Sequence, residues 1–229
     1  MKMLIHYLPR RIIAVASVVL CGCLNVSVAS AQNEATSAIN FQFSGLIPGT
    51  SAGTVITDFP APTSGTPVTG HATRAGGFQA RYSYQFNKWS GVDAGLTFAR
   101  YTQKYSGVLG PSSVQSRLRH ATADFVLHIP DPFARIHPFT VVGVGALRFS
   151  PSNNPNNAAG AGSQTRSALI YGGGADFDIS KRVGIRAEYR GAKFKAPDFY
   201  LVELHNNAQT HISEPSIGIY FRISGLRKG

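Results

Sequence analysis

Apolar and polar residues alternate strictly along several segments of the chain. Between positions 78 and 86 every second residue is apolar, and the residues in between are polar. An amphipathic helix would repeat its apolar positions every three or four residues. This segment is therefore predicted to be a β-strand with two different faces. Its apolar face comprises Phe78, Ala80, Tyr82, Tyr84 and Phe86, and its polar face comprises Gln79, Arg81, Ser83 and Gln85.

Two further segments, Val183–Gly191 and Ser216–Ile223, have the same period of two. Weaker alternation marks five other candidate strands. Together they make about eight strands, most of them close to the roughly nine to eleven residues that a tilted membrane strand needs. The weaker candidates are Ile39–Ser44, Val92–Tyr101, Leu118–His128, Pro138–Phe149 and Ser167–Asp178.

The connections between these strands alternate in length. Those at 87–90, 130–136 and 180–182 are short, whereas the others are longer and rich in Gly, Pro, Ser, Asn and Thr. Outer-membrane barrels have tight periplasmic turns and long outward loops. The predicted fold is therefore all-β, an eight-stranded antiparallel up-and-down transmembrane β-barrel. Its four long outer loops are predicted at about 46–73, 106–116, 150–166 and 197–212.

The charged residues indicate which face of the sheet points inward. A soluble barrel gathers its apolar face around a ligand, whereas a membrane barrel turns that face to lipid and fills its lumen with polar side chains. The short turn at 180–182 permits a register in which glycines lie opposite large charged residues, as a narrow lumen requires. The pairs in this register are Asp176 with Arg186, Gly174 with Glu188 and Gly172 with Arg190.

These charges predict a lumen plugged by an ionic network. Gln85 is expected opposite Asp93 across the turn at 87–90, and Glu214 is a further interior candidate. A buried ion without a partner costs on the order of several kcal/mol, so interior charges have to be paired. The predicted network contains Arg81, Asp93, Asp124, Asp176, Arg186, Glu188, Arg190 and Arg222, beside small lumen-facing Gly172 and Gly174. The predicted lipid-facing residues are Phe78, Tyr82, Tyr84, Ile185, Tyr189, Ile217, Ile219 and Phe221.

Residues 1–31 have the features of a secretory signal peptide. Three basic residues, at 2, 10 and 11, precede a short apolar core at 12–20, and Ala29-Ser30-Ala31 forms a cleavage site. The mature barrel domain is therefore predicted at 32–229, after export to the periplasm.

Both cysteines of the chain, Cys21 and Cys23, lie within this signal. The mature chain is therefore expected to have no thiol for a disulfide, redox chemistry or a metal. Lipidation of Cys23 instead of its removal remains open, because a small residue, Gly22, precedes it.

The formal net charge of the chain is +11. A basic surplus can indicate a nucleic-acid or anionic-surface partner. Here the basic residues are scattered singly among apolar neighbours, without a basic run before the end of the chain. Nucleic-acid binding is therefore not expected.

Aromatic residues occur near the ends of the predicted strands, where membrane barrels carry aromatic girdles. Phe86 and Trp89 are predicted to form a girdle at the short-turn side. The aromatics toward the long loops are Tyr101, Tyr105, Phe149, Phe194, Phe199 and Tyr200.

Three segments in the last third carry a family resemblance. These are 171–176 (YGGGAD), 183–191 (VGIRAEYRG) and 214–223 (EPSIGIYFRI), and they resemble the sixth, seventh and eighth strands of OmpA-like or OmpX-like outer-membrane β-barrel domains. The resemblance implies a location in the outer membrane, with its lipid and lipopolysaccharide as partners. It also implies recognition of the last strand by the outer-membrane assembly machinery. Family members usually end on an aromatic residue, whereas residues 224–229 follow this strand, and anchoring to the cell wall is not expected.

No motif in the sequence predicts a catalytic, cofactor or metal site. His205 and His211 share a predicted outer loop with Glu203, but no histidine pair has the helical spacing of a zinc enzyme. No G-x-S-x-G nucleophile motif appears. The glycines at 172–174 and at 160–162 do not open a helix with the lysine that a phosphate-binding loop needs.

The sequence favours a non-enzymatic outer-membrane protein with a structural or surface-interaction role, whose long loops could meet an unknown extracellular ligand. The alternative is a small porin or passive channel in which the same charges line a water path. A barrel enzyme and a soluble periplasmic ligand-binding barrel are less favoured. Conductance in a planar bilayer would identify a channel, and recovery without detergent would identify a soluble barrel.

Overall fold

The computed structural model describes residues 35–224, apart from 57–64, 66, 107–111, 130–134, 153–154, 156, 158–159, 202–203 and 206. The predicted signal peptide, Cys21, Cys23 and Glu203 lie outside the described residues. No helix in the described part of the chain is long and apolar enough to cross a membrane.

The described residues form antiparallel strands whose side chains alternate between a buried and an exposed face. This alternation follows from the period of two in the sequence, because successive residues of a strand point to opposite faces. The strands are β1 (Thr36–Pro48), β2 (Ser51–Thr54), β3 (Pro67–Ala72), β4 (Ala75–Gln85), β5 (Ser90–Ser106), β6 (Ser112–His128), β7 (Ile136–Pro151), β8 (Gln164–Asp178), β9 (Val183–Lys195) and β10 (Gln209–Ser224).

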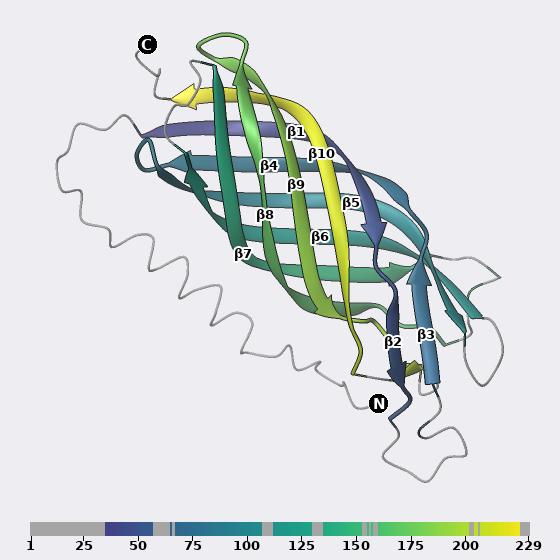
Figure 1. Ribbon diagram of the computed structural model, residues 1–229. Coiled ribbons are helices and arrows are strands. Elements are labelled where there is room, and N and C mark those ends of the chain that lie inside the picture. Colours follow the sequence, from purple (N-terminus) through teal and green to yellow (C-terminus); the bar gives the residue numbers. More distant parts are fainter. Residues whose placement is uncertain are drawn as a thin grey trace, which may run out of the picture. The chain divides into compact units, whose positions relative to one another are not determined.

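Eight of these strands close into a barrel. β1 pairs with β4 and β10, and each remaining strand from β4 to β10 pairs with its neighbours in chain order, including β5 with β6. All these pairings are antiparallel, which confirms the predicted eight-stranded up-and-down barrel. Figure 1 shows β1 and β10 side by side where the first and last strands meet.

A hairpin of β2 and β3 occupies part of the segment that was predicted as the first long loop. β3 pairs with the last residues of β5, from Thr69 with Ser106 to Ala72 with Gln103. Figure 1 shows this hairpin beyond the end of β1. The buried side chains of Val55 and Val68 anchor it to the apolar residues of the barrel mouth.

The strands extend further toward the long loops than predicted. β5 runs to Ser106 and β6 begins at Ser112, so the second connection is shorter than the predicted 106–116. Three other strands also exceed their predicted limits. β7 ends at Pro151, β9 ends at Lys195, and β10 begins at Gln209. The predicted limits were too narrow because the hydrogen-bonded ladders between these strands continue where the apolar alternation has already ended.

The predicted register of β8 and β9 is confirmed: Asp176 lies opposite Arg186, Gly174 opposite Glu188 and Gly172 opposite Arg190. The predicted pairing of Gln85 with Asp93 is wrong, because Asp93 lies opposite Ser83 and Gln85 opposite Gly91. The turn is shorter than was assumed. The side chain of Asn87 accepts hydrogen bonds from the backbone amides of Trp89 and Ser90 and closes it.

The apolar side chains of the alternating segments lie on the outer face of the barrel. Tyr82, Tyr189 and Ile217 are each about half exposed there, as are Phe78, Ile219 and Phe221, while Tyr84 and Ile185 on the same face are partly buried. The charged side chains opposite them point into the lumen and are buried.

Candidate functional site

Arg186 lies at the centre of a first group of buried charges in the lumen. Its Nε and Nη2 donate to the two carboxylate oxygens of Asp176, at 2.6 and 2.7 Å. Its Nη1 donates to Asp93 Oδ2 at 3.0 Å and to Ser83 Oγ at 3.3 Å. Such two-pronged contacts between a guanidinium and a carboxylate combine charge with fixed geometry. Arg186 therefore ties β9 to β8 and, across the lumen, to β4 and β5.

A second group lies around Arg190, next to the first. Its Nε and Nη2 donate to Glu188 at 2.9 and 3.2 Å, its Nη2 also reaches Asp93 Oδ2 at 3.3 Å, and its Nη1 pairs with Asp124. Arg81 approaches from β4, with Nε 3.2 Å from Glu188 Oε1 and Nη1 3.3 Å from Asp124 Oδ2. Asp93 therefore joins both groups into one network.

The structure brings seven of the eight predicted network residues together. All seven are at most 6% exposed. We call this set the ionic network: Arg81, Asp93, Asp124, Asp176, Arg186, Glu188 and Arg190. Because these charges come from β4, β5, β6, β8 and β9, their pairing links strands far apart around the barrel.

Arg222 is the exception, because it lies near the short-turn end of the barrel. Its Nη2 donates to Asp178 Oδ1 at 2.6 Å, and its guanidinium lies 5.2 Å from the centre of the Tyr220 ring. His137 approaches the other oxygen of Asp178 at 3.3 Å. The sequence predicts Arg222 in the central network because Arg222 lies on the polar face of its strand. The face of a residue does not determine its height along the barrel, so this prediction is wrong.

Gly172 and Gly174 lie opposite Arg190 and Glu188, as predicted, and the structure adds a second reason for glycine at these positions. A Cβ on either glycine would collide with the backbone of β9, at Tyr189 and Arg190 or at Ala187 and Glu188. The missing side chains therefore allow β8 and β9 to approach closely.

A buried pair of a histidine and a carboxylate follows the network toward the long loops. His120 Nδ1 lies 3.1 Å from Glu214 Oε1, and Gln79 Nε2 lies 3.5 Å from Glu214 Oε2. Glu214 was a candidate interior residue from the sequence, whereas His120 was not singled out. Its parity with Asp124 on β6 would have indicated an inward direction.

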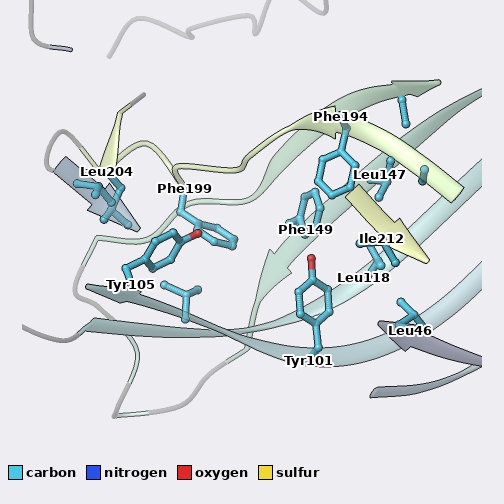
Figure 2. Packing of buried hydrophobic residues seen from close by; sticks show 14 of the residues in the cluster. Leu46, Tyr101, Tyr105, Leu118, Leu147, Phe149, Phe194, Phe199, Leu204 and Ile212 are labelled. Carbon is cyan, nitrogen blue, oxygen red and sulfur yellow. The ribbon is translucent and has the colours of Figure 1, made fainter. Parts of the chain in front are cut away.

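Beyond this pair, toward the long loops, most of the lumen is filled by apolar side chains. Phe149 is fully buried, with ring centres of Tyr101, Phe194 and Phe199 at 6.1, 5.8 and 6.4 Å. Figure 2 shows Phe149 between Phe194 and Tyr101. We call this set the apolar plug: Leu46, Val55, Val68, Tyr101, Tyr105, Val114, Leu118, Leu147, Phe149, Ala168, Ile170, Ala192, Phe194, Phe199, Leu204 and Ile212.

The apolar plug corrects the interpretation of the aromatics near the long loops. Tyr101, Tyr105, Phe149, Phe194 and Phe199 are at most 5% exposed and face the lumen, so they do not form a girdle. Tyr200 alone of that set is exposed, at 71%. At the short-turn end, Trp89 is 48% exposed beneath Lys88, and Phe86 packs edge-on against Tyr84.

Part of the last long connection folds into the barrel mouth. Phe199 and Tyr200 have φ values of 53° and 63°, a left-handed conformation that non-glycine residues rarely adopt. This bend carries Phe199 into the apolar plug. The Tyr105 hydroxyl donates to the backbone oxygen of Pro197 at 2.8 Å and fastens the segment from inside.

Asp198 holds the same segment through several polar contacts. Gln164 Nε2 donates to Asp198 Oδ1 at 2.7 Å, His205 Nδ1 lies 2.8 Å from Oδ2, and Arg166 Nη2 lies 3.3 Å from Oδ2. Burial alone would raise the pKa of Asp198. The hydrogen bonds from Gln164, the Tyr200 amide and His205, together with the charge of Arg166, outweigh burial and lower this pKa below its ordinary value.

The described histidines do not form a metal site. Among the described residues, no group of three or more His, Cys, Asp or Glu side chains is arranged to hold a metal ion. His205 is half exposed and contacts Asp198, while His71 and His211 are exposed on β3 and β10. The charged side chains of the lumen neutralise one another, and the apolar ones pack together.

Three solved structures are similar to this chain, and the first of them supports the barrel architecture. The outer membrane protein OprG from Pseudomonas aeruginosa superposes with a TM-score of 0.60 at 14% identity, covering 83% of this chain and 97% of that one. Neisserial surface protein A has a TM-score of 0.48 at 15% identity, covering 82% and 97%. Ail, the attachment invasion locus protein of Yersinia pestis, has a TM-score of 0.43 at 16% identity, covering 83% and 100%.

A search of curated proteins found no match. The model of one protein family, described as outer membrane protein beta-barrel domain, matches residues 16–221. The match spans most of the chain and agrees with the closed eight-stranded barrel and its apolar outer face. The chain therefore belongs to the outer membrane protein β-barrel domain family and is located in the outer membrane.

Proposed function

We propose that this protein is a non-enzymatic, non-conducting scaffold that presents its outer hairpin and loops at the cell surface. The observation that carries the proposal is that two different sets of side chains fill the two halves of the lumen. The ionic network occupies the half toward the short turns, and the apolar plug occupies the half toward the long loops.

Each half opposes the passage of a different kind of solute. An ion entering from the long-loop end would lose its water among the rings of Phe149, Phe194 and Phe199. A solute entering from the other end would have to separate guanidinium and carboxylate groups that are 2.6–3.3 Å apart. These two barriers in series favour a closed barrel over the alternative of a small porin or passive channel.

The hairpin of β2 and β3 supports a role at the surface. Its inner residues Val55 and Val68 belong to the apolar plug, while Ala52, Thr69 and His71 on its other side are exposed. A hairpin fixed in this way presents its outer side without the ordering cost that a flexible loop has on binding. An unknown extracellular partner is therefore expected to bind there.

Conductance in a planar bilayer tests the closed lumen. The full chain, folded and inserted, is expected to give no steady current in 1 M salt, while a large porin measured in the same bilayer serves as the positive control. A reproducible steady current from the wild-type chain would favour the porin instead.

Cysteine labelling on intact cells tests the presentation of the hairpin. Thr69→Cys on β3 is expected to react with a membrane-impermeant maleimide, whereas the control Lys181→Cys in the turn between β8 and β9 is expected to react only after the outer membrane is opened. The reverse pattern would contradict this orientation.

A further inference from the structure

Four arginines lie together on the outer face of the barrel toward the long loops. Arg100 on β5 is directly opposite Arg117 on β6, and Arg119 on β6 is directly opposite Arg148 on β7. All four are exposed. Neighbouring strands are about 4.8 Å apart, so these four backbone positions span only about 10 Å across the sheet. We call this set the arginine patch.

None of these arginines has an ion-pair partner among the described residues. The described carboxylates belong to the lumen, to the short-turn end or to the folded mouth segment: Asp93, Asp124, Asp176, Asp178, Glu188, Asp198 and Glu214. Like charges directly opposite each other destabilise a sheet. Within the described part of the chain, the arginine patch therefore has a positive charge that no carboxylate compensates and that an external anion would neutralise.

The surroundings of the arginine patch place it at the edge of the apolar band. Arg119 lies directly opposite Phe98, and the next outward residue of β6, Ala121, lies opposite Ala146. Beyond them the outer face continues with Leu96 and Val144, each about half exposed. Arginine is costly in the middle of the membrane but tolerated near its interfaces. The patch is therefore expected at the level of the outer-leaflet head groups.

Arginine is suited to a phosphate ligand at this position. Its planar fork donates two parallel hydrogen bonds to a phosphate group, and its weak hydration makes it effective at a membrane interface. Three outward residues next to the patch have small apolar side chains, and we call them the alanine strip: Ala121, Ala123 and Ala146. A ligand with phosphate groups and acyl chains would satisfy both features at once.

We propose that Arg100, Arg117, Arg119 and Arg148 bind the phosphate groups of a phosphorylated glycolipid of the outer leaflet, the lipopolysaccharide class. Its acyl chains lie along the alanine strip of β6 and β7. This site depends on the insertion of the barrel in the outer membrane and not on whether its lumen conducts. It anchors one side of the barrel, at β5 to β7, to the surrounding lipid.

The test compares the full chain with Arg117→Gln/Arg119→Gln in nanodiscs of phosphatidylethanolamine that contain lipopolysaccharide. The control is Lys181→Gln/Arg182→Gln, which removes two exposed charges at the short-turn end. Titration and native mass spectrometry are expected to show about tenfold or more weaker glycolipid binding for the patch variant and wild-type binding for the control. Equal binding by the patch variant, or equal weakening by the control, would overturn the proposal.

Four further ligands distinguish the source of the phosphate. Dephosphorylated lipopolysaccharide, phosphatidylglycerol, inorganic phosphate and heparin are each expected to bind the wild type more weakly than intact lipopolysaccharide. Equal binding of the dephosphorylated form would exclude a phosphate site, and equal binding of phosphatidylglycerol would indicate general attraction to anionic lipid. Equal binding of inorganic phosphate or heparin would replace the lipid by a soluble anion or a sulfated polysaccharide.

A conservative variant separates loss of the site from loss of the fold. Arg117→Lys/Arg119→Lys keeps the charge and removes the fork, so it is expected to retain part of the affinity. The difference in gel migration between heated and unheated samples should be the same for all variants, because the substituted side chains are exposed outside the lumen. Binding by the glutamine variant equal to that by the lysine variant would contradict a role for charge.

Discussion

His120 and Glu214 are in contact at the border between the two halves of the lumen, with His120 Nδ1 3.1 Å from Glu214 Oε1. Both side chains are at most 2% exposed, and His120 Nε2 has no hydrogen-bond partner among the described residues. The ionic network continues on one side of this pair, and apolar residues such as Leu118 and Leu147 follow on the other. A buried polar pair of this kind stabilises the fold only while both partners are present, because removal of one leaves the other buried without its contact.

A double-mutant cycle measures this dependence. His120→Leu or Glu214→Leu alone leaves one buried polar group without its partner and is expected to lower the free energy of unfolding by about 2 kcal/mol or more. The double variant extends the apolar plug by one layer and is expected to recover most of the loss. Urea unfolding in lipid bilayers gives the values. Losses that simply add would show that the two residues do not act as a pair.

Glu188→Ala tests the ionic network. The substitution removes the carboxylate that contacts Arg190 at 2.9 Å and Arg81 at 3.2 Å, and it leaves two buried guanidinium groups under-neutralised. The expected cost is about 3–5 kcal/mol, visible as a lower midpoint temperature in the heat-dependent shift of gel mobility. Ala187→Val on the outer face of the same strand is the control and is expected to leave the midpoint nearly unchanged. An unchanged midpoint for Glu188→Ala would argue against the network as a source of stability.

Gly174→Ala tests the close approach of β8 and β9. The added methyl group would collide with backbone atoms of Ala187 and Glu188, so the two strands would have to separate. The expected cost is about 1–3 kcal/mol, together with a lower yield of folded barrel. At Gly76 on β4 a methyl group would meet nothing within 4 Å, so Gly76→Ala is the matched control. Equal folded yields for both variants would contradict the proposed role of Gly174.

The sequence was sufficient to predict the barrel because period-two alternation is a local property. The register of β8 on β9 could also be predicted, since the short turn at 180–182 fixes which residues meet. At the turn from β4 to β5 the same reasoning failed, because the side chain of Asn87 shortens that turn. Side-chain hydrogen bonds of this kind are not visible in a hydrophobicity pattern.

The apolar plug escaped prediction because the polarity of the two faces reverses along the strands. On β5 the inward face begins with Asp93 and ends with Tyr101 and Tyr105, while the outward face changes from Leu96 to Arg100. If one face of the strand is assumed to be polar along its whole length, Tyr101 and Tyr105 are assigned to the outer face, although they point into the lumen. Counting parity from Asp93 to Tyr105 would have found their inward direction. The same count places Arg100 of the arginine patch outside.

The pH dependence of the mouth segment follows from Asp198. Its carboxylate accepts hydrogen bonds from Gln164 and lies near Arg166, and these contacts lower its pKa in the folded state. A lowered folded pKa means that this stabilisation is complete above the ordinary carboxyl pKa, about 4, and is lost as the pH falls through the lowered value. Hydrogen-exchange protection at 196–201 is therefore expected to stay constant from pH 8 to pH 5 and to decrease only below about pH 4.

Asp198→Asn should reproduce the acid effect at neutral pH, because the amide weakens the contacts with Arg166 and His205. His205→Gln is the control, since the His205 side chain is 51% exposed and contributes only one of these contacts. Its effect on protection is expected to be smaller. Loss of protection in wild type already between pH 7 and pH 6 would assign the dependence to a histidine instead of Asp198.

Phe149→Ala separates the contributions of the two halves of the lumen to closure. The Phe149 ring is fully buried against Tyr101, Phe194 and Phe199, so its removal opens a cavity at an expected cost of about 3–5 kcal/mol. The variant is nevertheless expected to remain silent in a planar bilayer, because the ionic network still crosses the lumen. Arg190→Ala alone is expected to be silent as well, because the apolar plug remains in place.

The combination Phe149→Ala/Arg190→Ala is expected to conduct. The first substitution removes the ring at the centre of the apolar plug. The second removes the positive charge that contacts the carboxylates of Glu188, Asp124 and Asp93. Because buried carboxylates without a partner need hydration, water is expected to enter the network. The resulting path is lined by acidic groups and should favour cations, which a reversal potential in a salt gradient measures. Conduction by Phe149→Ala alone would show that the apolar plug is the only barrier. Silence of the double variant would place the barrier in the folded mouth segment around Phe199.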